Sequence, residues 1–154
     1  VNDFVAVPSA PGLSPASGVT LEAWVRPSVV PPAGRLDTIV AKGDSYSLQL
    51  NGPRLEFTTV KGTTRRRVQG PAPIVAGQTY HVVGTFDGRT QRLFVNGVQV
   101  ATDSFQKGLN ANTRPVVFGS TDTTSELLAA RIDEVAVYAR ALTPAQVANH
   151  YAAG

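Results

Sequence analysis

A chain of 154 residues suits one domain with a sizeable core, because chains of this length typically bury about 68–70% of their unfolded surface. Charged residues make up only 16%, which argues against disorder, and the absence of cysteine excludes disulfides, thiolate metal sites and thiol catalysis. The net charge is +3, and the one dense basic patch, Arg65–Arg67 with Lys61 nearby, is too small for a nucleic-acid surface. No apolar run is long enough to span a bilayer, so no membrane insertion is expected.

Most of the chain alternates apolar and polar residues with a period of two, which predicts β-strands rather than helices. The predicted strands are, in chain order, Asn2–Val7, Val19–Val25, Ser45–Leu50, Arg54–Val60, Thr79–Phe86, Gln91–Val95, Val98–Thr102, Val116–Gly119 and Arg131–Tyr138. The segments 29–34 and 69–73 contain Gly and Pro and are predicted to be loops. No amphipathic helix separates these strands, which disfavours parallel βαβ folds.

Two short turn sequences connect the strands in the middle of the chain. Asn96-Gly97 stands between apolar strands, where a two-residue type I′ hairpin needs a positive φ at both central residues. Asp87-Gly88 marks a similar reversal just upstream. Together the two turns predict a three-stranded meander from Thr79 to Thr102.

The end of the chain has a different pattern. Thr143 is followed by a proline at the first helical position and by Gln146 three residues later, so that the Thr hydroxyl and the Gln amide can satisfy free backbone N–H groups. This pattern predicts one short helix, Pro144–Ala152, which packs Val147 and Tyr151 across a sheet edge.

Four segments follow one another in a recognisable order: TLEAWVRP (20–27), TIVAKGDSYSLQL (38–50), AGQTYHVVGTFDGRTQRLFVNGVQV (76–100) and ARIDEVAVYARALTPAQVANHY (130–151). Their order resembles the laminin-G-like jelly rolls of the concanavalin A-like lectin/glucanase superfamily. The resemblance implies an all-β sandwich of two antiparallel sheets with a short C-terminal helix. It also implies a single monomeric module, residues 1–154, excised from a larger secreted or cell-surface protein.

Many members of this superfamily bind calcium, and the resemblance implies a structural ion that ties the first strand to the last. Its implied ligands are Asp3, Gly43, Asp44 and Asp133. Ca²⁺ takes six to eight oxygen ligands, which carboxylates and backbone carbonyls supply. Asp133 and Glu134 also lie inside an apolar strand, where unpaired carboxylates are costly. Their carboxylates are expected to bind either a metal ion or, alternatively, Arg side chains and backbone N–H groups.

The concave sheet face is the first candidate for ligand binding, because aromatic rings pack against the apolar faces of sugars. If the small apolar residues of the first long strand face the core, Trp24 and Glu22 face the other side. His81 and Phe94 are candidates for the same groove. The alternative is that Trp24 is a scaffold residue, packed between strands or under a loop with Glu22 satisfied beside it.

The second candidate is a rim of basic loops formed by the segments 61–67 and 106–114. Arg65, Arg66 and Arg67 have the forked guanidinium groups that bind carboxylates and sulfates in a bidentate way, which indicates an acidic polysaccharide. The alternative is a solvated basic edge strand that prevents edge-to-edge aggregation.

Catalysis is not expected. Glucanases of this superfamily place two carboxylates on one strand face by a Glu-x-Asp-x-Glu type of spacing, which is absent here. Asp133 and Glu134 are adjacent and are predicted to point to opposite faces. The predicted function is therefore a non-catalytic carbohydrate-binding or adhesion module that binds a glycan or a glycosylated surface. The alternatives are a structural spacer or protein-interaction domain and, less favoured, a glycan-cleaving enzyme.

Overall fold

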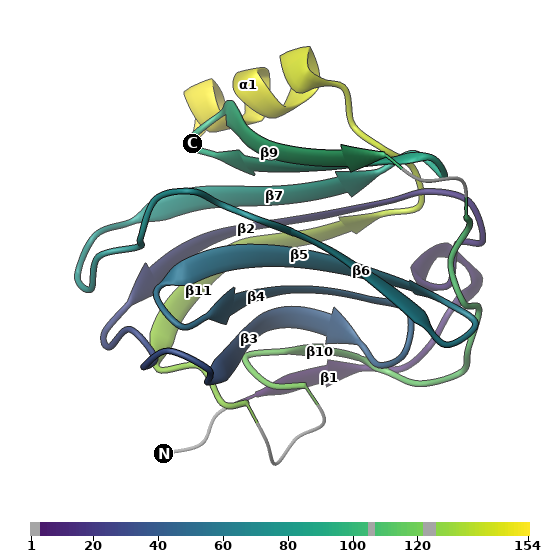
Figure 1. The fold of residues 1–154 in the computed structure, drawn as a ribbon, viewed down its shortest axis with the longest axis horizontal. Helices are drawn as coiled ribbons and strands as arrows, with labels where there is room; N and C mark the ends of the chain where they lie inside the picture. The colour runs from purple at the N-terminus through teal and green to yellow at the C-terminus, as the bar shows by residue number, and fades with distance from the viewer. Residues whose placement is uncertain (1–3, 105–106, 122–125) are drawn as a thin grey trace.

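The computed structural model describes residues 4–104, 107–121 and 126–154, and these residues form two antiparallel sheets and a C-terminal helix (Figure 1). One sheet of the described chain has six strands in the order β1 (Val5–Val7), β10 (Val116–Phe118), β3 (Leu36–Lys42), β4 (Tyr46–Asn51), β5 (Arg54–Lys61) and β6 (Thr64–Gln69). The other has five, in the order β11 (Ala130–Tyr138), β2 (Val19–Pro27), β7 (Tyr80–Phe86), β8 (Thr90–Val95) and β9 (Val98–Ser104). The prediction of an all-β sandwich is confirmed.

The core lies between the two sheets and follows from the period of two. Alternate residues of β2, from Val19 to Val25, are buried against alternate residues of β4 and β5, such as Leu48 and Phe57. Phe57 needs a glycine opposite it, because a Cβ at Gly84 would clash with its ring. Burying a side chain of this size contributes about 1.5–3 kcal/mol.

The meander and the helix form where predicted, but the helix packs on the outer face of the five-stranded sheet rather than across a sheet edge. Asn96 and Gly97, between β8 and β9, have φ of 50° and 77°, as the type I′ hairpin requires. Helix α1 (Pro144–Ala153) begins with the predicted capping box, in which Thr143 Oγ1 accepts a hydrogen bond from the Gln146 backbone N–H and Gln146 Oε1 accepts one from the Thr143 N–H. No helix in the described parts of the chain is long and apolar enough to cross a membrane.

Two strands were missed by the sequence prediction. β3 has an irregularity in its pairing between Thr38 and Val40, so that Ile39 and Val40 are both fully buried and the period of two is lost. β6 occupies part of the predicted basic loop 61–67 and is the edge strand of its sheet. A short 3₁₀ helix, η1 (Pro11–Leu13), was also not predicted. Among the described residues, the first strand begins at Val5 rather than at residue 2.

Candidate functional site

Helix α1 lies on the outer face of the five-stranded sheet, where the sequence predicted an open groove (Figure 1). Phe94 is fully buried in a second apolar cluster with Val83, Leu142 and Val147. His81 is only 1% exposed. The expectation that Phe94 and His81 line an open groove is therefore wrong, because the chain folds back after β11 and covers them.

A hydrogen-bonded group beneath the helix joins three distant parts of the chain. The Glu22 carboxylate lies 2.7 Å from His81 Nε2 on β7 and 3.1 Å from His150 Nδ1 on α1. Burial raises the pKa of Glu22, but the hydrogen bonds and charges of His81 and His150 together outweigh burial and hold this pKa below its ordinary value. The group fastens α1 to the sheet, and Glu22 is satisfied there.

Trp24 is a half-buried part of the same packing. Its ring centroid lies 5.0 Å from that of His81 and 5.8 Å from that of Tyr151 on α1, and Gly154 lies against the indole. These contacts support the scaffold reading of Trp24. The rest of the ring borders a hollow of about 340 Å³, which is also lined by Arg26, Arg131, Asp133 and Glu134.

Asp133 and Glu134 do not point to opposite faces as predicted. The pairing of β11 with β2 is irregular between Asp133 and Ala136, and Glu134 has a φ of 48°. This bulge breaks the alternation of the strand, so that both carboxylates are exposed and line the same hollow. The Asp133 carboxylate accepts a hydrogen bond from the Glu134 N–H at 2.9 Å. A backbone N–H partner was one of the two alternatives that the sequence analysis gave for this carboxylate.

The predicted calcium ligands do not converge in the described residues. Asp44 lies in the turn after β3 and pairs with Arg114 at 3.0 Å, whereas Asp133 lies on the other sheet and lines a different hollow. Gly43 is beside Asp44, and Asp3 lies outside the described residues. Within the ranges that the structure describes, no group of three His, Cys, Asp or Glu side chains is placed to hold a metal ion. Asp44 and Asp133 therefore do not fit the shared structural ion that the resemblance implied.

The outer face of the six-stranded sheet carries a row of buried polar side chains. Ser47 Oγ donates to Gln49 Oε1 at 2.9 Å, and Gln49 Nε2 donates to Glu56 Oε1 at 2.9 Å. The second oxygen of Glu56 accepts from Asn51 Nδ2 at 2.9 Å, and Thr58 Oγ1 lies 3.4 Å from the first. We call Ser47, Gln49, Asn51, Glu56 and Thr58 the polar row. Its planar groups are held in fixed orientations.

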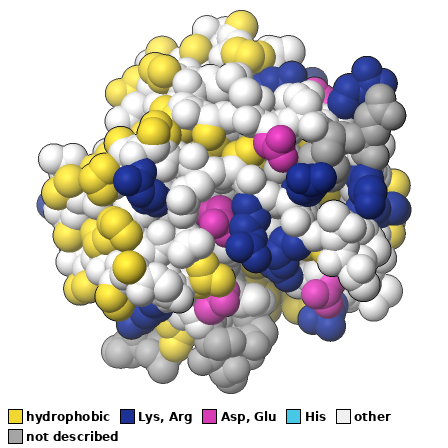
Figure 2. Space-filling view, in the orientation of Figure 1, with side chains coloured by type: hydrophobic (Ala, Val, Ile, Leu, Met, Phe, Trp, Pro, Cys, Tyr) yellow, Lys and Arg dark blue, Asp and Glu magenta, His cyan; other side chains and the backbone are white. Residues whose placement is uncertain are grey.

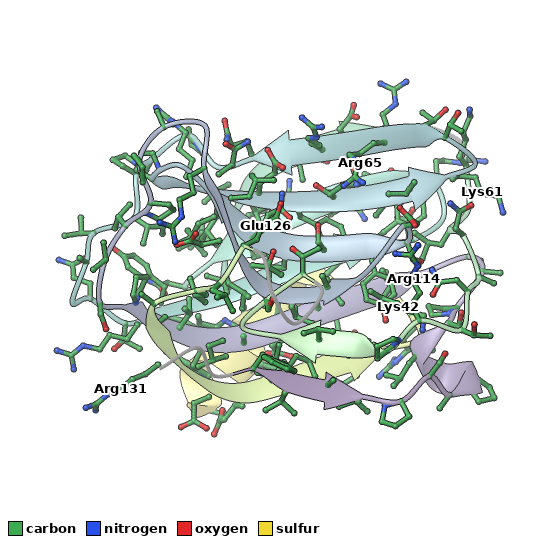
Figure 3. All side chains as sticks on the ribbon, turned by 90° about the horizontal axis from the view of Figure 1, so that it is seen from below. Lys42, Lys61, Arg65, Arg114, Glu126 and Arg131 are labelled. Carbon is green, nitrogen blue, oxygen red and sulfur yellow. The ribbon has the colours of Figure 1, made fainter. Side chains whose placement is uncertain are left out.

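The polar row borders a cavity of about 200 Å³, which we call the polar cavity. Its lining includes Ser47 and Gln49 from the row, and Asp44, Arg65, Arg114 and Glu126 from the surrounding segments. Figure 3 shows Arg65, Arg114 and Glu126 reaching this face from three different parts of the chain. Glu126 is itself held by hydrogen bonds from the Thr38 and Thr121 hydroxyls.

The three predicted arginines lie on the edge strand β6 rather than in a loop. This position agrees with the alternative prediction of a basic edge strand that prevents aggregation. Arg65 and Arg67 pair with Val60 and Thr58 of β5 and share the outer face with the polar row, whereas alternation turns Arg66 the other way. Arg67 Nε lies 3.9 Å from Glu56 Oε1. Figure 2 shows Lys and Arg side chains, with Asp and Glu among them, across the middle and right of the face over which β6 runs in Figure 1.

Sequence reasoning missed most residues of the polar cavity. A signal for two of them was present, because Ser47 and Gln49 alternate with Tyr46, Leu48 and Leu50, which face the core. The basic segments 61–67 and 106–114 had pointed to Arg65 and Arg114, whereas no local pattern pointed to Glu126, which reaches the cavity only through the fold.

Comparison with known families identifies the fold. The family model Laminin_G_3, described as the concanavalin A-like lectin/glucanases superfamily, matches residues 1–148. The chain belongs to this family. The resemblance stated from the sequence is thereby confirmed. No curated protein matches the chain significantly.

Several solved structures share the fold of this family member. The binding domain of Paraclostridial Mosquitocidal Protein 1 has a TM-score of 0.79 and 17% identity over 97% of this chain and 41% of that chain. A Bacteroides ovatus protein described as a "putative carbohydrate binding protein" has a TM-score of 0.77 and 20% identity over 95% and 44%. The binding domain of Botulinum Neurotoxin DC, in complex with SialylT, has a TM-score of 0.72 and 15% identity over 90% and 36%. The chain thus spans less than half the length of each, and these similar structures are described as binding domains or a binding protein.

Proposed function

We propose that this chain is a non-catalytic carbohydrate-binding module of an extracellular protein, and that it binds a glycan or a glycosylated surface through the polar cavity. The observation that carries the proposal is the polar row, in which Gln49 and Glu56 are buried on the outer face of a sheet and are fixed by hydrogen bonds with each other, Ser47 and Asn51. Similar structures described as a "putative carbohydrate binding protein" and as a neurotoxin binding domain in complex with SialylT support it.

The chemistry of the row suits sugar hydroxyls. Gln49 uses one amide N–H for Glu56 and one carbonyl lone pair for Ser47, so its remaining N–H and lone pair are oriented but unused by the row. A hydroxyl can donate to one of these groups and accept from the other. Because Gln49 is already ordered, a ligand loses little affinity to side-chain ordering when it binds.

The engagement of Glu56 and Glu126 on this face supports binding rather than hydrolysis. Glycoside hydrolysis needs one carboxyl group to donate a proton and a second to attack or to activate water. Glu56 is engaged by amide donors from Gln49 and Asn51, and Glu126 by two Thr hydroxyls, so both serve as hydrogen-bond acceptors within the protein. Asp133 and Glu134 are neighbours on one exposed bulge rather than partners across a cleft.

The test is isothermal titration of the purified chain with a panel of neutral and acidic oligosaccharides. We expect binding to at least one class, and we expect Gln49→Ala to weaken it about tenfold through the loss of hydrogen bonds in a buried site. Gln99→Ala, at an exposed position of β9 on the other sheet, is the matched control and should bind like the wild type.

Three outcomes contradict the proposal. If Gln49→Ala folds normally and binds the glycan with unchanged affinity, the polar cavity is not the binding site. Binding to no member of the panel would leave a spacer or protein-interaction domain. The appearance of new reducing ends during incubation with a glycan would show an enzyme.

A further inference from the structure

Two arginine side chains from distant parts of the chain border the polar cavity. Arg65 comes from edge strand β6, and Arg114 comes from the segment that precedes β10. Figure 3 shows both toward the same end of the six-stranded sheet, with Arg131 at the far end. The Arg65 side chain makes no ion pair and no hydrogen bond with any residue that the structure describes, so its forked donors are available to a ligand.

Arg114 is placed by several contacts. Its Nη2 pairs with the Asp44 carboxylate at 3.0 Å, and its backbone carbonyl accepts a hydrogen bond from Lys42 Nζ. Its side chain lies across Gly43, where an added Cβ would be only 3.1 Å from Nη1. An exposed ion pair of this kind contributes little stability, but together with the packing on Gly43 it fixes where the guanidinium lies. The donors that Asp44 does not use remain free for a second acceptor.

The cavity has an excess of positive charge. Its lining contains the cations Lys42, Arg65 and Arg114 and the acids Asp44 and Glu126. Lys42 is fully buried and donates to Ser9 Oγ at 2.8 Å and to the Arg114 carbonyl, neither of which is an anion. Burial lowers the pKa of Lys42, which is the direction expected when no nearby charge compensates for lost hydration. An anion in the cavity would offset this cost.

We propose that Arg65 and Arg114 hold a carboxylate or sulfate group of the bound glycan, while Ser47 and Gln49 bind hydroxyls of the same sugar residue. This inference rests on the proposed glycan site and names its ligand class, an anionic glycan. Two guanidinium groups that line one cavity suit a planar carboxylate or a tetrahedral sulfate, because a guanidinium can donate two parallel hydrogen bonds.

The experiment uses matched pairs of probes. Oligogalacturonate is compared with its carboxyl-reduced counterpart, and a sulfated galactan oligosaccharide with its desulfated counterpart, by isothermal titration at low and high NaCl. We expect at least one charged probe to bind about tenfold more tightly than its neutral counterpart, and this preference to shrink at high salt. The two pairs show whether a carboxylate or a sulfate is the anion recognised.

The variants separate a specific site from general charge attraction. Arg65→Gln should abolish the preference for the charged probe over its neutral counterpart. Arg131→Gln is the matched control, since it removes the same charge from an exposed position on the other sheet. Gly43→Ala keeps every charge but shifts the Arg114 side chain slightly, so it should weaken binding of the charged probe by several-fold, with a normal melting temperature.

Each outcome decides one of the two proposals. Equal affinity for charged and neutral counterparts would overturn the anion site and keep the glycan site. An Arg131→Gln effect as large as that of Arg65→Gln would also overturn it, because general attraction would then explain the binding. If the protein binds none of the four probes and no member of the wider panel, the glycan site and the anion site are both overturned.

Discussion

The outer faces of the two sheets differ in what lies on them: one is covered by a helix, and the other has a cavity. The five-stranded sheet is closed by α1, which buries Phe94 and His81 beneath Val147 and a layer of aromatic rings. The six-stranded sheet keeps a cavity whose floor includes Ser47 and Gln49. Both faces contain buried polar side chains. On the five-stranded sheet Glu22 is hydrogen-bonded to the helix, whereas on the six-stranded sheet the side chains of the polar row are hydrogen-bonded to one another.

This difference distinguishes a face that stabilises the fold from a face that is available to a ligand. Glu22 beneath α1 already has two imidazole partners from the protein, and the aromatic rings there are stacked on one another. The polar cavity instead has unused donors, of which the Arg65 guanidinium and the ordered Gln49 amide are the clearest among the described residues. An aromatic residue on a sheet is therefore a weaker guide to this site than a buried amide with hydrogen-bonding capacity left over.

The largest effect should come from the helix-covered face. Phe94→Ala removes a fully buried ring from the cluster beneath α1 and should lower the free energy of unfolding by about 3–5 kcal/mol, measured by urea denaturation. Phe94→Leu is the milder companion, with a smaller loss. Glycan affinity of the folded Phe94→Leu protein should be unchanged, and a loss of binding without unfolding would break the division between the two faces.

The polar row should respond in both stability and binding. Glu56→Ala leaves Gln49 and Asn51 without their buried acceptor, which should cost about 1–3 kcal/mol of unfolding free energy. It should also weaken glycan binding, because Gln49 is no longer held. A variant that loses stability but binds glycans normally would show that the row is only a structural network.

The Glu22 group should give the protein an acid-sensitive stability. The native pKa of Glu22 is below its unfolded value, so the unfolded chain binds more protons in the range between them, and stability falls as the pH drops below about 4.5. His81, His150 and Tyr138 face this carboxyl. Glu22→Gln should cost about 1 kcal/mol at neutral pH and flatten the acid side of the curve, measured by thermal melts. An unchanged acid side would contradict this role.

The smallest effect is expected from chelation. Because Asp44 pairs with Arg114 and Asp133 lies on the other sheet, EDTA should leave the melting temperature unchanged. A rise of several degrees on adding calcium would contradict this expectation and would restore the predicted ion. The measurement is a pair of melts at equal ionic strength.

Much of the fold could be predicted because its signals are local. The alternation in β2, β4 and β5, the Asn96-Gly97 turn and the capping box at Thr143 each depend on a few neighbouring residues. Where the local rule is broken, prediction failed. The irregular pairing in β3 hid that strand, and the bulge at Asp133 turned two carboxylates to one side.

The sequence by itself determined the strands, the meander, the helix and the family. Only the tertiary structure decided that α1 returns over Trp24, His81 and Phe94, and that Arg114 and Arg65 line the same cavity as Ser47 and Gln49. Strand alternation states which side chains share a face, but it does not state what later covers that face. That choice depends on contacts between segments far apart in the chain, such as Glu22 with His150, which no short pattern encodes.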